Sequence, residues 1–326
     1  MTERKRVFSG IQPTGNIHIG NYIGAGRNYV ALQEDYDTIY CVVDLHAMTV
    51  PFDPPDLRQG KKDAARMMLA IGIDPSRSLL YYQADVAQHV ELSWIFSTLT
   101  GLGQLERMTQ FKEKSNKAGQ NLGLFSYPVL QAADILIHRV HAVPVGDDQA
   151  QHLELTRDLA ERFNHRYGDI FPIPERITPE VGARVMSLAD PISKMSKSDP
   201  SEKSRISLND PPDQIMSKFK AAVTDMGSEV AYDPAGKPGV SNLLEIFSVF
   251  SGRSIDDLAA EYGSVGYGTF KMAVAEAVID ALSPIQKAYG ELSDAEVDAV
   301  MASSAEKAKV SADATMTLVR EAVGLS

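Results

Sequence analysis

Residues 7–21 read VFSGIQPTGNIHIGN. The apolar start predicts a buried strand over residues 7–11, and Pro13 with the glycines after it ends the strand in a tight turn. A helix is expected to begin near residues 19–21. Its N-terminus would then meet the end of the strand, which suits a phosphate group. Gly20 would let a ligand approach the backbone, while His18 and Asn21 could each donate a hydrogen bond. A strand, turn and helix without a ligand is the open alternative.

Three further runs have the apolar, β-branched or aromatic character of buried strands, at residues 39–43, 79–82 and 142–145. Helical patterns lie between and after them, at residues 56–71, 124–138 and 149–167. Strands that alternate with helices indicate an α/β fold with a doubly wound parallel sheet, covered on both faces. In such a sheet, ligands bind beyond the carboxyl ends of the strands, where the strand order reverses.

The character of the chain changes after about residue 185. Residues 187–205 are polar and charged, and the patterns that follow are helical, at residues 212–223, 242–250, 255–262, 269–289 and 294–323. We therefore expect an α/β domain over residues 1–185, a loop over residues 186–206 and a helical domain over residues 207–326. The last helix could pack back on the first domain.

Composition narrows the class of protein without naming a function. The chain has 326 residues, of which 44% are hydrophobic and 23% charged, as in an ordinary globular protein. We see no signal peptide and no membrane span, and a cytoplasmic location is expected. Cys41 is the only cysteine, which excludes an internal disulfide and a Cys-based zinc site. The net charge of −11 argues against coating nucleic acid by bulk electrostatics.

Residues 194–198 read KMSKS and lie in a polar stretch between Pro191 and Pro200. Two lysines with hydroxyls between and after them offer movable positive charge to a triphosphate and to a pyrophosphate leaving group. Taken alone, the string is also compatible with a solvated loop or a phosphorylation site.

The pattern at residues 124–138 predicts an apolar helix with Pro128 in its first turn. Tyr127, Gln131 and Asp134 fall at i, i+4 and i+7, so they form a polar stripe on one face. An unpaired carboxylate is costly to bury, and a ligand with a polar end would explain the stripe. Contact with solvent or with other side chains is the alternative.

The segment His18-Ile19-Gly20-Asn21 resembles the His-Ile-Gly-His motif of class I aminoacyl-tRNA synthetases, and residues 194–198 match the second motif of that class. Asn21 replaces the final histidine, so stabilisation there would rest on neutral hydrogen bonds. Residues 44–47, 106–115, 127–134, 143–149 and 182–187 are similar to the tryptophanyl members. The resemblance implies a Rossmann-like catalytic domain with a smaller all-helical domain that reads the tRNA.

The resemblance also implies roles in the activation of an amino acid by ATP with Mg²⁺. Catalysis would rest on positioning and charge stabilisation by His18, Asn21, Lys114, Lys194 and Lys197. The backbone of Val185 would meet adenine, and no structural metal is expected. The ATP-binding residues would be Gln12, Pro13, Thr14, Gly20, Asn21, Gly146, Asp147, Asp148, Val185, Lys194, Met195, Ser196, Lys197 and Ser198.

For the amino acid, the resemblance implies a site in which Asp134 accepts the indole N–H and His46 lies beside the substrate. Tyr127 and Gln149 would hold the amino group. The tryptophan-binding residues would be Phe8, His46, Tyr127, Gln131, Asp134, Val143, Val145 and Gln149. The implied partners are L-tryptophan, ATP and tRNA(Trp), with the protein acting as a homodimer and not at a membrane.

A tyrosine enzyme is the alternative within the family. Phe8 stands where tyrosyl members carry a tyrosine that bonds the substrate hydroxyl, and a phenyl ring makes no such bond. Gln131 fits less well, because glutamine is familiar in tyrosyl sites. A non-catalytic paralogue that binds tryptophan or RNA is the alternative outside the enzymes, and the complete signatures disfavour it.

Overall fold

The computed structural model describes residues 4–13, 17–109, 121–146, 149–178, 184–197 and 199–326. Contacts divide the chain into two compact units. The sheet unit consists of Met1–Thr14, Ala31–Pro179 and Ser293–Ser326, and the helical unit consists of Gly15–Val30 and Glu180–Leu292. This division differs from the expected boundaries near residues 185 and 206, because residues 15–30, which carry the first signature, group with the helical unit. The last helix groups with the sheet unit, which is the packing that the sequence left open.

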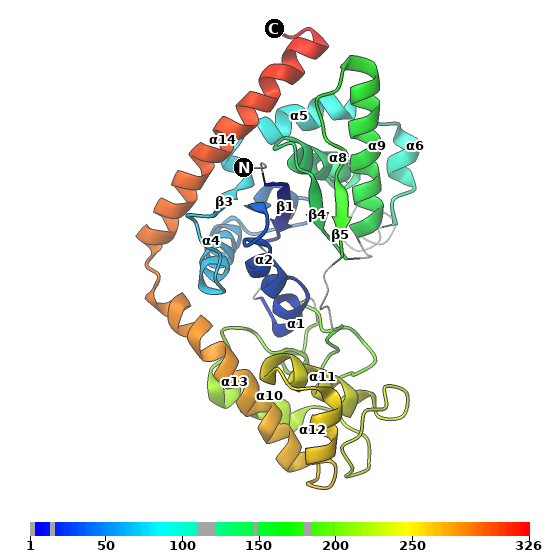
Figure 1. Ribbon diagram of the computed structural model, residues 1–326, viewed down its shortest axis with the longest axis vertical. Coiled ribbons are helices and arrows are strands. Elements are labelled where there is room, and N and C mark those ends of the chain that lie inside the picture. Colours follow the sequence, from blue (N-terminus) through cyan, green and yellow to red (C-terminus); the bar gives the residue numbers. More distant parts are fainter. Residues whose placement is uncertain (1–3, 14–16, 110–120, 147–148, 179–183, 198) are drawn as a thin grey trace. The chain divides into compact units, whose positions relative to one another are not determined.

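The sheet unit contains a five-stranded sheet in the order β3-β2-β1-β4-β5, and every neighbouring pair is parallel (Figure 1). The order reverses between β1 and β4, as in doubly wound sheets that bind ligands at the point of reversal. The predicted Rossmann-like α/β fold is therefore confirmed. The strands are β1 (Arg6–Ile11), β2 (Asp37–Val42), β3 (Ser78–Tyr82), β4 (Ala142–Pro144) and β5 (Glu175–Ile177).

Both faces of this sheet are covered. Successive side chains of a strand point to opposite faces, and Tyr40 and Cys41 on β2 are each fully buried. Cys41 belongs to an apolar core that includes Phe8 on β1 and Ile135 on α8 (Leu122–Leu136). Burial on both sides explains why the strands read as apolar runs in the sequence.

Three helices of the sheet unit, α4 (Pro54–Ala70), α8 and α9 (Ala150–Tyr167), lie close to the expected ranges 56–71, 124–138 and 149–167. α8 begins at Leu122, where the Asn121 side chain accepts a 2.8 Å hydrogen bond from the Leu124 N–H. Pro128 therefore lies inside this helix and not in its first turn, which corrects the prediction. The strand β5 was missed because two of its three residues are exposed and charged. The other helices are α3 (Asp44–Ala47), η2 (Gln83–Asp85), α5 (Gln88–Ser97), α6 (Leu102–Glu106) and α14 (Asp294–Val323).

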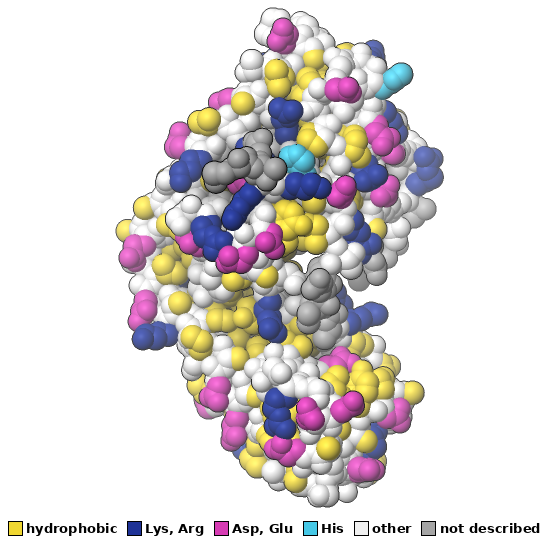
Figure 2. Space-filling model, viewed as in Figure 1, with side chains coloured by type: hydrophobic (Ala, Val, Ile, Leu, Met, Phe, Trp, Pro, Cys, Tyr) yellow, Lys and Arg dark blue, Asp and Glu magenta, His cyan; other side chains and the backbone are white. Residues whose placement is uncertain are grey.

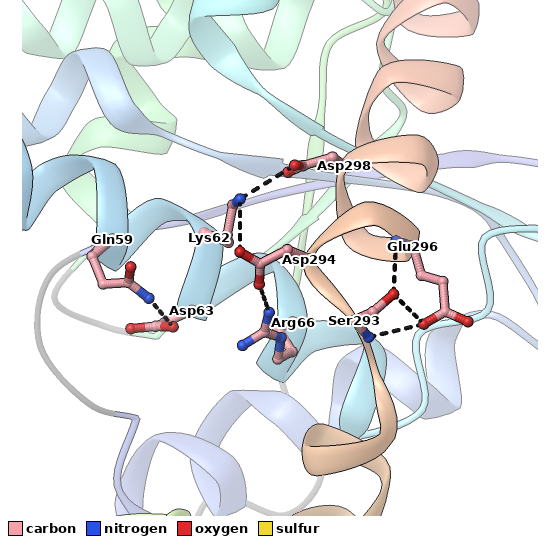
Figure 3. Close-up of polar contacts among 8 residues, drawn as sticks. All are labelled: Gln59, Lys62, Asp63, Arg66, Ser293, Asp294, Glu296 and Asp298. Atoms are coloured by element: carbon pink, nitrogen blue, oxygen red, sulfur yellow. Dashed lines mark hydrogen bonds and ion pairs between the residues drawn. The ribbon is translucent and has the colours of Figure 1, made fainter.

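The long helix α14 lies along β3 and is tied to α4 at its first turn (Figure 3). Ser293 and Glu296 form a capping box in which the Glu296 carboxylate accepts a 2.8 Å hydrogen bond from the Ser293 N–H. Lys62 on α4 lies 3.3 Å from the carboxylate of Asp294, and Arg66 pairs with the same carboxylate. Capping and ion pairs thus fix the start of α14 against the sheet unit.

The helical unit begins with α1 (Ile19–Asn21), continues through a π-helical turn η1 (Tyr22–Gly26) and enters α2 (Arg27–Leu32), most of which groups with it. Its C-terminal part packs α13 against α10 and α11 around buried side chains such as Phe219, Phe247 and Phe270. The helices of this part are η4 (Glu202–Ser204), α10 (Pro212–Ala221), α11 (Pro238–Ser251), α12 (Ile255–Tyr262) and α13 (Tyr267–Glu291). Across the described ranges of the chain, no helix is long and apolar enough to cross a membrane.

Candidate functional site

The first signature begins where α1 starts, and His18 caps that helix. The Nδ1 atom of His18 accepts a hydrogen bond of 3.3 Å from the Asn21 N–H, and the Asn21 Oδ1 atom accepts one of 3.3 Å from the His18 N–H. Because Nδ1 accepts, the hydrogen of a neutral His18 ring lies on Nε2. His18 can therefore donate through Nε2, and Asn21 through its amide nitrogen.

The electrostatic surroundings keep His18 uncharged. Its side chain is 3% exposed, and burial is the largest cause that lowers its pKa from 6.5 to about 4. The charges of Lys197, Arg205 and Lys194 lower this pKa further. At neutral pH the ring is thus a neutral donor surrounded by cations, which suits the negative charge of a phosphate group.

The second signature is held by backbone pairing within the helical unit. The N–H of Met195 donates to the carbonyl of Val185 over 3.0 Å, and the side chain of Met195 is buried. Lys194 is exposed, while Lys197 is half-buried and its pKa is lowered by burial. The buried methionine anchors the segment, so the two lysines extend from a fixed backbone.

Backbone bonds join the first signature to residues 206–208, which follow the second signature in the sequence. The Ile19 N–H donates to the Ile206 carbonyl over 2.9 Å, and the Leu208 N–H donates to the Ile17 carbonyl over 2.9 Å. A Cβ atom on Gly20 would lie 3.0 Å from the His18 ring and 3.5 Å from Val185 Cβ. Glycine at this position therefore lets Val185 and the cap of α1 come close together.

Asn242 on α11 was not singled out in the sequence, yet it holds the strand-like segment beside Val185. Its side chain accepts a 2.8 Å hydrogen bond from the Met186 N–H and donates one of 3.1 Å to the Met186 carbonyl. Asn242 is 3% exposed. Only the tertiary structure identifies it, because a single asparagine in a helical pattern carries no distinguishing signal.

The polar stripe of α8 lies in the sheet unit, and Asp134 is its most buried member at 1% exposed. The Oδ2 atom of Asp134 lies 2.7 Å from His46 Nε2. The Oδ1 atom accepts a 2.7 Å hydrogen bond from Gln83 Nε2 and lies 2.8 Å from His89 Nδ1. Burial acts to raise the pKa of Asp134, but the contacts with His46 and His89 outweigh it and hold the pKa well below its usual range. Asp134 is therefore a buried carboxylate.

Tyr127 and His46 line the same cluster. The Tyr127 hydroxyl lies 2.8 Å from His152 Nε2, and its ring meets the His46 ring edge-on with the centroids 6.0 Å apart. Burial raises the pKa of Tyr127, so its hydroxyl stays neutral. His152 is buried and fixes the hydroxyl of Tyr127.

Gln131 and Gln149 approach each other at the other end of the stripe. The Gln131 amide donates to Gln149 Oε1 over 3.4 Å, and both side chains are half-buried. Phe8 is buried and stacks on His138 at a centroid distance of 6.4 Å. Val143 is buried and Val145 is half-buried, in and just after β4. All eight residues expected to bind tryptophan therefore lie in the sheet unit.

The residues expected to bind ATP divide between the two units. Gln12 and Pro13 follow β1, and Gly146 follows β4, so they lie at the carboxyl ends of neighbouring strands where the strand order reverses. A Cβ atom on Gly60 of α4 would lie only 2.4 Å from the Pro13 carbonyl oxygen, so this glycine allows the turn to pass close to α4. The expected residues Thr14, Lys114, Asp147, Asp148 and Ser198 lie outside the described residues.

Sequence reasoning missed Gln83, His89, Tyr81 and His138, all fully buried in the sheet unit. Each is a polar residue in or beside an apolar run, a signal that also fits an ordinary core residue. Within the described ranges, no group of three or more His, Cys, Asp or Glu side chains is arranged to hold a metal ion. The cluster therefore offers hydrogen bonds and one carboxylate.

Comparison with known proteins agrees with this arrangement. The family model described as "tRNA synthetases class I (W and Y)" matches residues 1–283. A tryptophan–tRNA ligase of Caldanaerobacter subterraneus subsp. tengcongensis is 52% identical, over 98% of this chain and 98% of its own length. Tryptophanyl-tRNA synthetase structures from Mycoplasma pneumoniae and from Campylobacter jejuni, the latter complexed with ADP and tryptophan, give TM-scores of 0.87 and 0.86. Their identities are 34% and 35%, over 99% and 98% of this chain and 98% and 99% of theirs. The chain therefore belongs to the class I tRNA synthetases for tryptophan and tyrosine, and within that family to the tryptophan–tRNA ligases.

Proposed function

We propose that this chain activates L-tryptophan with ATP and then esterifies tRNA(Trp). A carboxylate oxygen of tryptophan attacks the α-phosphorus of ATP, a new O–P bond forms and pyrophosphate leaves. A hydroxyl at the 3′ end of the tRNA then attacks the acyl carbon of the resulting adenylate, an ester bond forms and AMP leaves. The observation that carries the proposal is the presence of both signatures in one unit, where the charges of Lys194 and Lys197 act on a neutral His18.

Positioning and charge stabilisation account for the first step, which needs no protein base. His18 and Asn21 would donate neutral hydrogen bonds to phosphate oxygens, and Lys194 and Lys197 would balance the charge that builds on the leaving pyrophosphate. Lys114, outside the described residues, is proposed to act with them. Mg²⁺ would be bound through the phosphate oxygens of ATP, because histidine and lysine offer only nitrogen and Asn21 Oδ1 already accepts from the His18 N–H.

The rest of the nucleotide would meet backbone and small residues. We propose that the Val185 backbone bonds adenine and that Gly146 lies at the ribose, since Val185 packs beside Gly20 and Gly146 follows a strand at the switch point. The remaining proposed ATP contacts are Gln12, Pro13, Thr14, Asp147, Asp148, Met195, Ser196 and Ser198.

Tryptophan would be selected by the cluster around Asp134. The buried carboxylate is proposed to accept the indole N–H, with the His46 ring beside it and Phe8, Val143 and Val145 against the apolar ring. Tyr127 and Gln149 would hold the amino group, and Gln131 would act through its bond to Gln149. A site that satisfies an N–H donor rejects an analogue that lacks it, because a buried acceptor is then left unpaired.

Recognition of tRNA is proposed for the helical part within residues 207–326. On the face drawn in Figure 2, basic and acidic side chains are interspersed, in keeping with the net charge of −11. Recognition by local contacts therefore fits this chain better than a broad basic surface. A cytoplasmic location follows from the proposed role in protein synthesis.

We further propose a homodimer formed through the sheet unit. Trp94 on α5, Leu102 on α6 and Leu122 at the start of α8 are 74%, 69% and 78% exposed. The helices α5 and α6 both contact α8, so these side chains come from elements that pack together. Large exposed apolar side chains in one region are typical of an interface between subunits.

Exchange of labelled pyrophosphate into ATP tests the activity. Exchange that depends on tryptophan is expected, with tyrosine at the background level. Exchange with tyrosine alone would contradict the proposed substrate, and no exchange with either amino acid would favour a non-catalytic paralogue.

Light scattering tests the dimer: the wild-type chain should have twice the monomer mass, and Trp94→Glu should shift it towards the monomer. A monomeric wild type would contradict this part of the proposal.

A further inference from the structure

A chain of buried polar side chains runs from Asp134 to the helix α14. His89 Nδ1 lies 2.8 Å from Asp134 Oδ1, and His89 Nε2 lies 2.9 Å from the Tyr81 hydroxyl. The same hydroxyl lies 2.8 Å from His138 Nε2, and His138 Nδ1 lies 3.2 Å from the Ser311 hydroxyl. His89, Tyr81 and His138 are fully buried, and all five residues belong to the sheet unit.

The hydrogens of this chain can all point one way. Burial, followed by the charges of His89 and Arg6, lowers the pKa of His138 well below its usual value, so its ring is neutral with one N–H. Burial also raises the pKa of Tyr81, which therefore keeps its hydroxyl hydrogen. When the Nδ1–H of His89 points towards Asp134, His89 Nε2 accepts the hydrogen of the Tyr81 hydroxyl. The oxygen of that hydroxyl then accepts the Nε2–H of His138. Each hydrogen is then used once, and the chain ends at the carboxylate.

The two oxygens of Asp134 differ in the donors that they meet. Oδ1 faces both His89 and Gln83, whose own Oε1 accepts a 3.2 Å hydrogen bond from the Leu45 N–H. The contact with His89 is short but lies off the direction of a well-aligned hydrogen bond, so we treat it as electrostatic. Among the described residues, Oδ2 meets only the side chain of His46 at such a distance. A carboxylate accepts about four hydrogen bonds, so the acceptor position that remains lies on Oδ2.

We propose that His89 is a positioning residue for substrate selection, which fixes Asp134 Oδ1 so that Oδ2 accepts the indole N–H. The inference rests on the proposed function, in which Asp134 contacts tryptophan. A carboxylate held through one oxygen cannot rotate freely about its Cβ–Cγ bond. The other oxygen then meets the substrate at a fixed angle. Contacts with His89 and Gln83 also offset the cost of burying the carboxylate beside the apolar core.

The test compares tryptophan with benzothienylalanine, in which sulfur replaces the indole N–H. The quantity measured is the ratio of kcat/KM for the two amino acids in pyrophosphate exchange. In His89→Gln the amide nitrogen stands near the place of Nε2, so Asp134 Oδ1 loses the contact with Nδ1 and keeps only Gln83. In His89→Asn the amide nitrogen stands near the place of Nδ1 and keeps that contact. We expect the preference for tryptophan to fall about tenfold in His89→Gln and to be largely retained in His89→Asn.

Two further variants separate positioning from stability. Tyr81→Phe keeps the ring and breaks the chain, so a smaller loss of the preference is expected. Thr38→Val is the matched control, because it removes a buried 2.6 Å hydrogen bond to Ser78 in the same sheet, and the preference should not change. An equal loss of activity towards both amino acids in His89→Gln would overturn the inference. A wild-type enzyme without any preference would instead contradict the role of Asp134 in the proposed function.

Discussion

The surroundings of Asp134 and those of the two signature segments differ in which group carries the charge. In the sheet unit, a single buried carboxylate meets imidazole and amide donors. In the helical unit, Lys194, Lys197 and Arg205 act on a neutral His18 that is itself buried. The first arrangement discriminates between neutral side chains, because a buried acceptor with a missing partner is penalised. The second suits a highly charged ligand, since long lysine side chains can follow phosphates as they separate.

The largest effect is expected where charge changes during the reaction. Lys197→Ala should lower kcat for pyrophosphate exchange by roughly 10²–10³-fold, because stabilisation of the developing charge is lost. The KM for tryptophan should stay within about twofold, since Lys197 lies in the other unit from Asp134. Lys203→Ala removes an exposed lysine of the same stretch and serves as the control. Equal losses in the two variants would show that general surface charge, and not Lys197, is responsible.

Removal of the Asp134 carboxylate should weaken the binding of tryptophan and not that of ATP. Asp134→Ala is expected to raise the KM for tryptophan by about 10- to 100-fold and to leave the KM for ATP unchanged, because a hydrogen bond to a charged acceptor is lost. Asp134→Asn keeps the volume and one acceptor oxygen, so a smaller rise is expected. Steady-state exchange kinetics with each substrate varied in turn measure both constants. An unchanged KM for tryptophan would exclude Asp134 from the substrate site.

A methyl group beside His18 should have a moderate effect. In Gly20→Ala the new Cβ would lie 3.0 Å from the His18 ring, so the ring must shift from its position as a cap. We expect a loss in kcat on the order of tenfold, because displacement of a positioned donor weakens its contact in the transition state. Gly24→Ala is the matched control, since no heavy atom lies within 4 Å of its new Cβ. If Gly24→Ala lost as much activity, a general effect on the helix would explain both variants.

The smallest effect concerns the protonation of His18. Titration of the free enzyme followed by NMR should give a His18 pKa of about 4, and Lys197→Met should raise it only slightly, because burial is the larger cause. Since the folded pKa is below the unfolded value of 6.5, the unfolded state binds the proton more readily between these values. The contribution of His18 to the free energy of unfolding is therefore complete above about pH 6.5 and is lost as the pH falls towards 4. A His18 pKa near 6.5 would contradict the described surroundings.

The sequence predicted the α/β fold because strands buried on both faces read as apolar runs, and α12 and α14 match the expected residues 255–262 and 294–323. It missed β5, whose Glu175 and Arg176 are exposed. It also placed Pro128 in the first turn of α8, because the Asn121 cap gave a weaker signal than the proline. The grouping of residues 15–30 with the helical unit depends on backbone bonds to residues 206–208, which no local pattern reveals.

The residues of the candidate site likewise fall into those that local sequence patterns identified and those that only the structure revealed. The signatures and the polar stripe of α8 identified His18, Lys197 and Asp134 from spacing and from the resemblance to the family. The side chains that hold Asp134 were not identified, because Gln83 and His89 come from other elements and meet it only in the folded chain. Local patterns thus indicated the residues proposed to touch substrates, and tertiary contacts were needed to find those that orient them.

Binding of tryptophan in the absence of ATP tests the division between the two regions most directly. Isothermal titration calorimetry with wild type, Asp134→Ala and Lys197→Ala gives the Kd for tryptophan in each case. We expect a Kd at least about tenfold weaker in Asp134→Ala and one within about twofold of wild type in Lys197→Ala. Equal weakening in both variants, or an unchanged Kd in Asp134→Ala, would contradict the assignment of tryptophan to Asp134 and of the phosphates to the signature lysines.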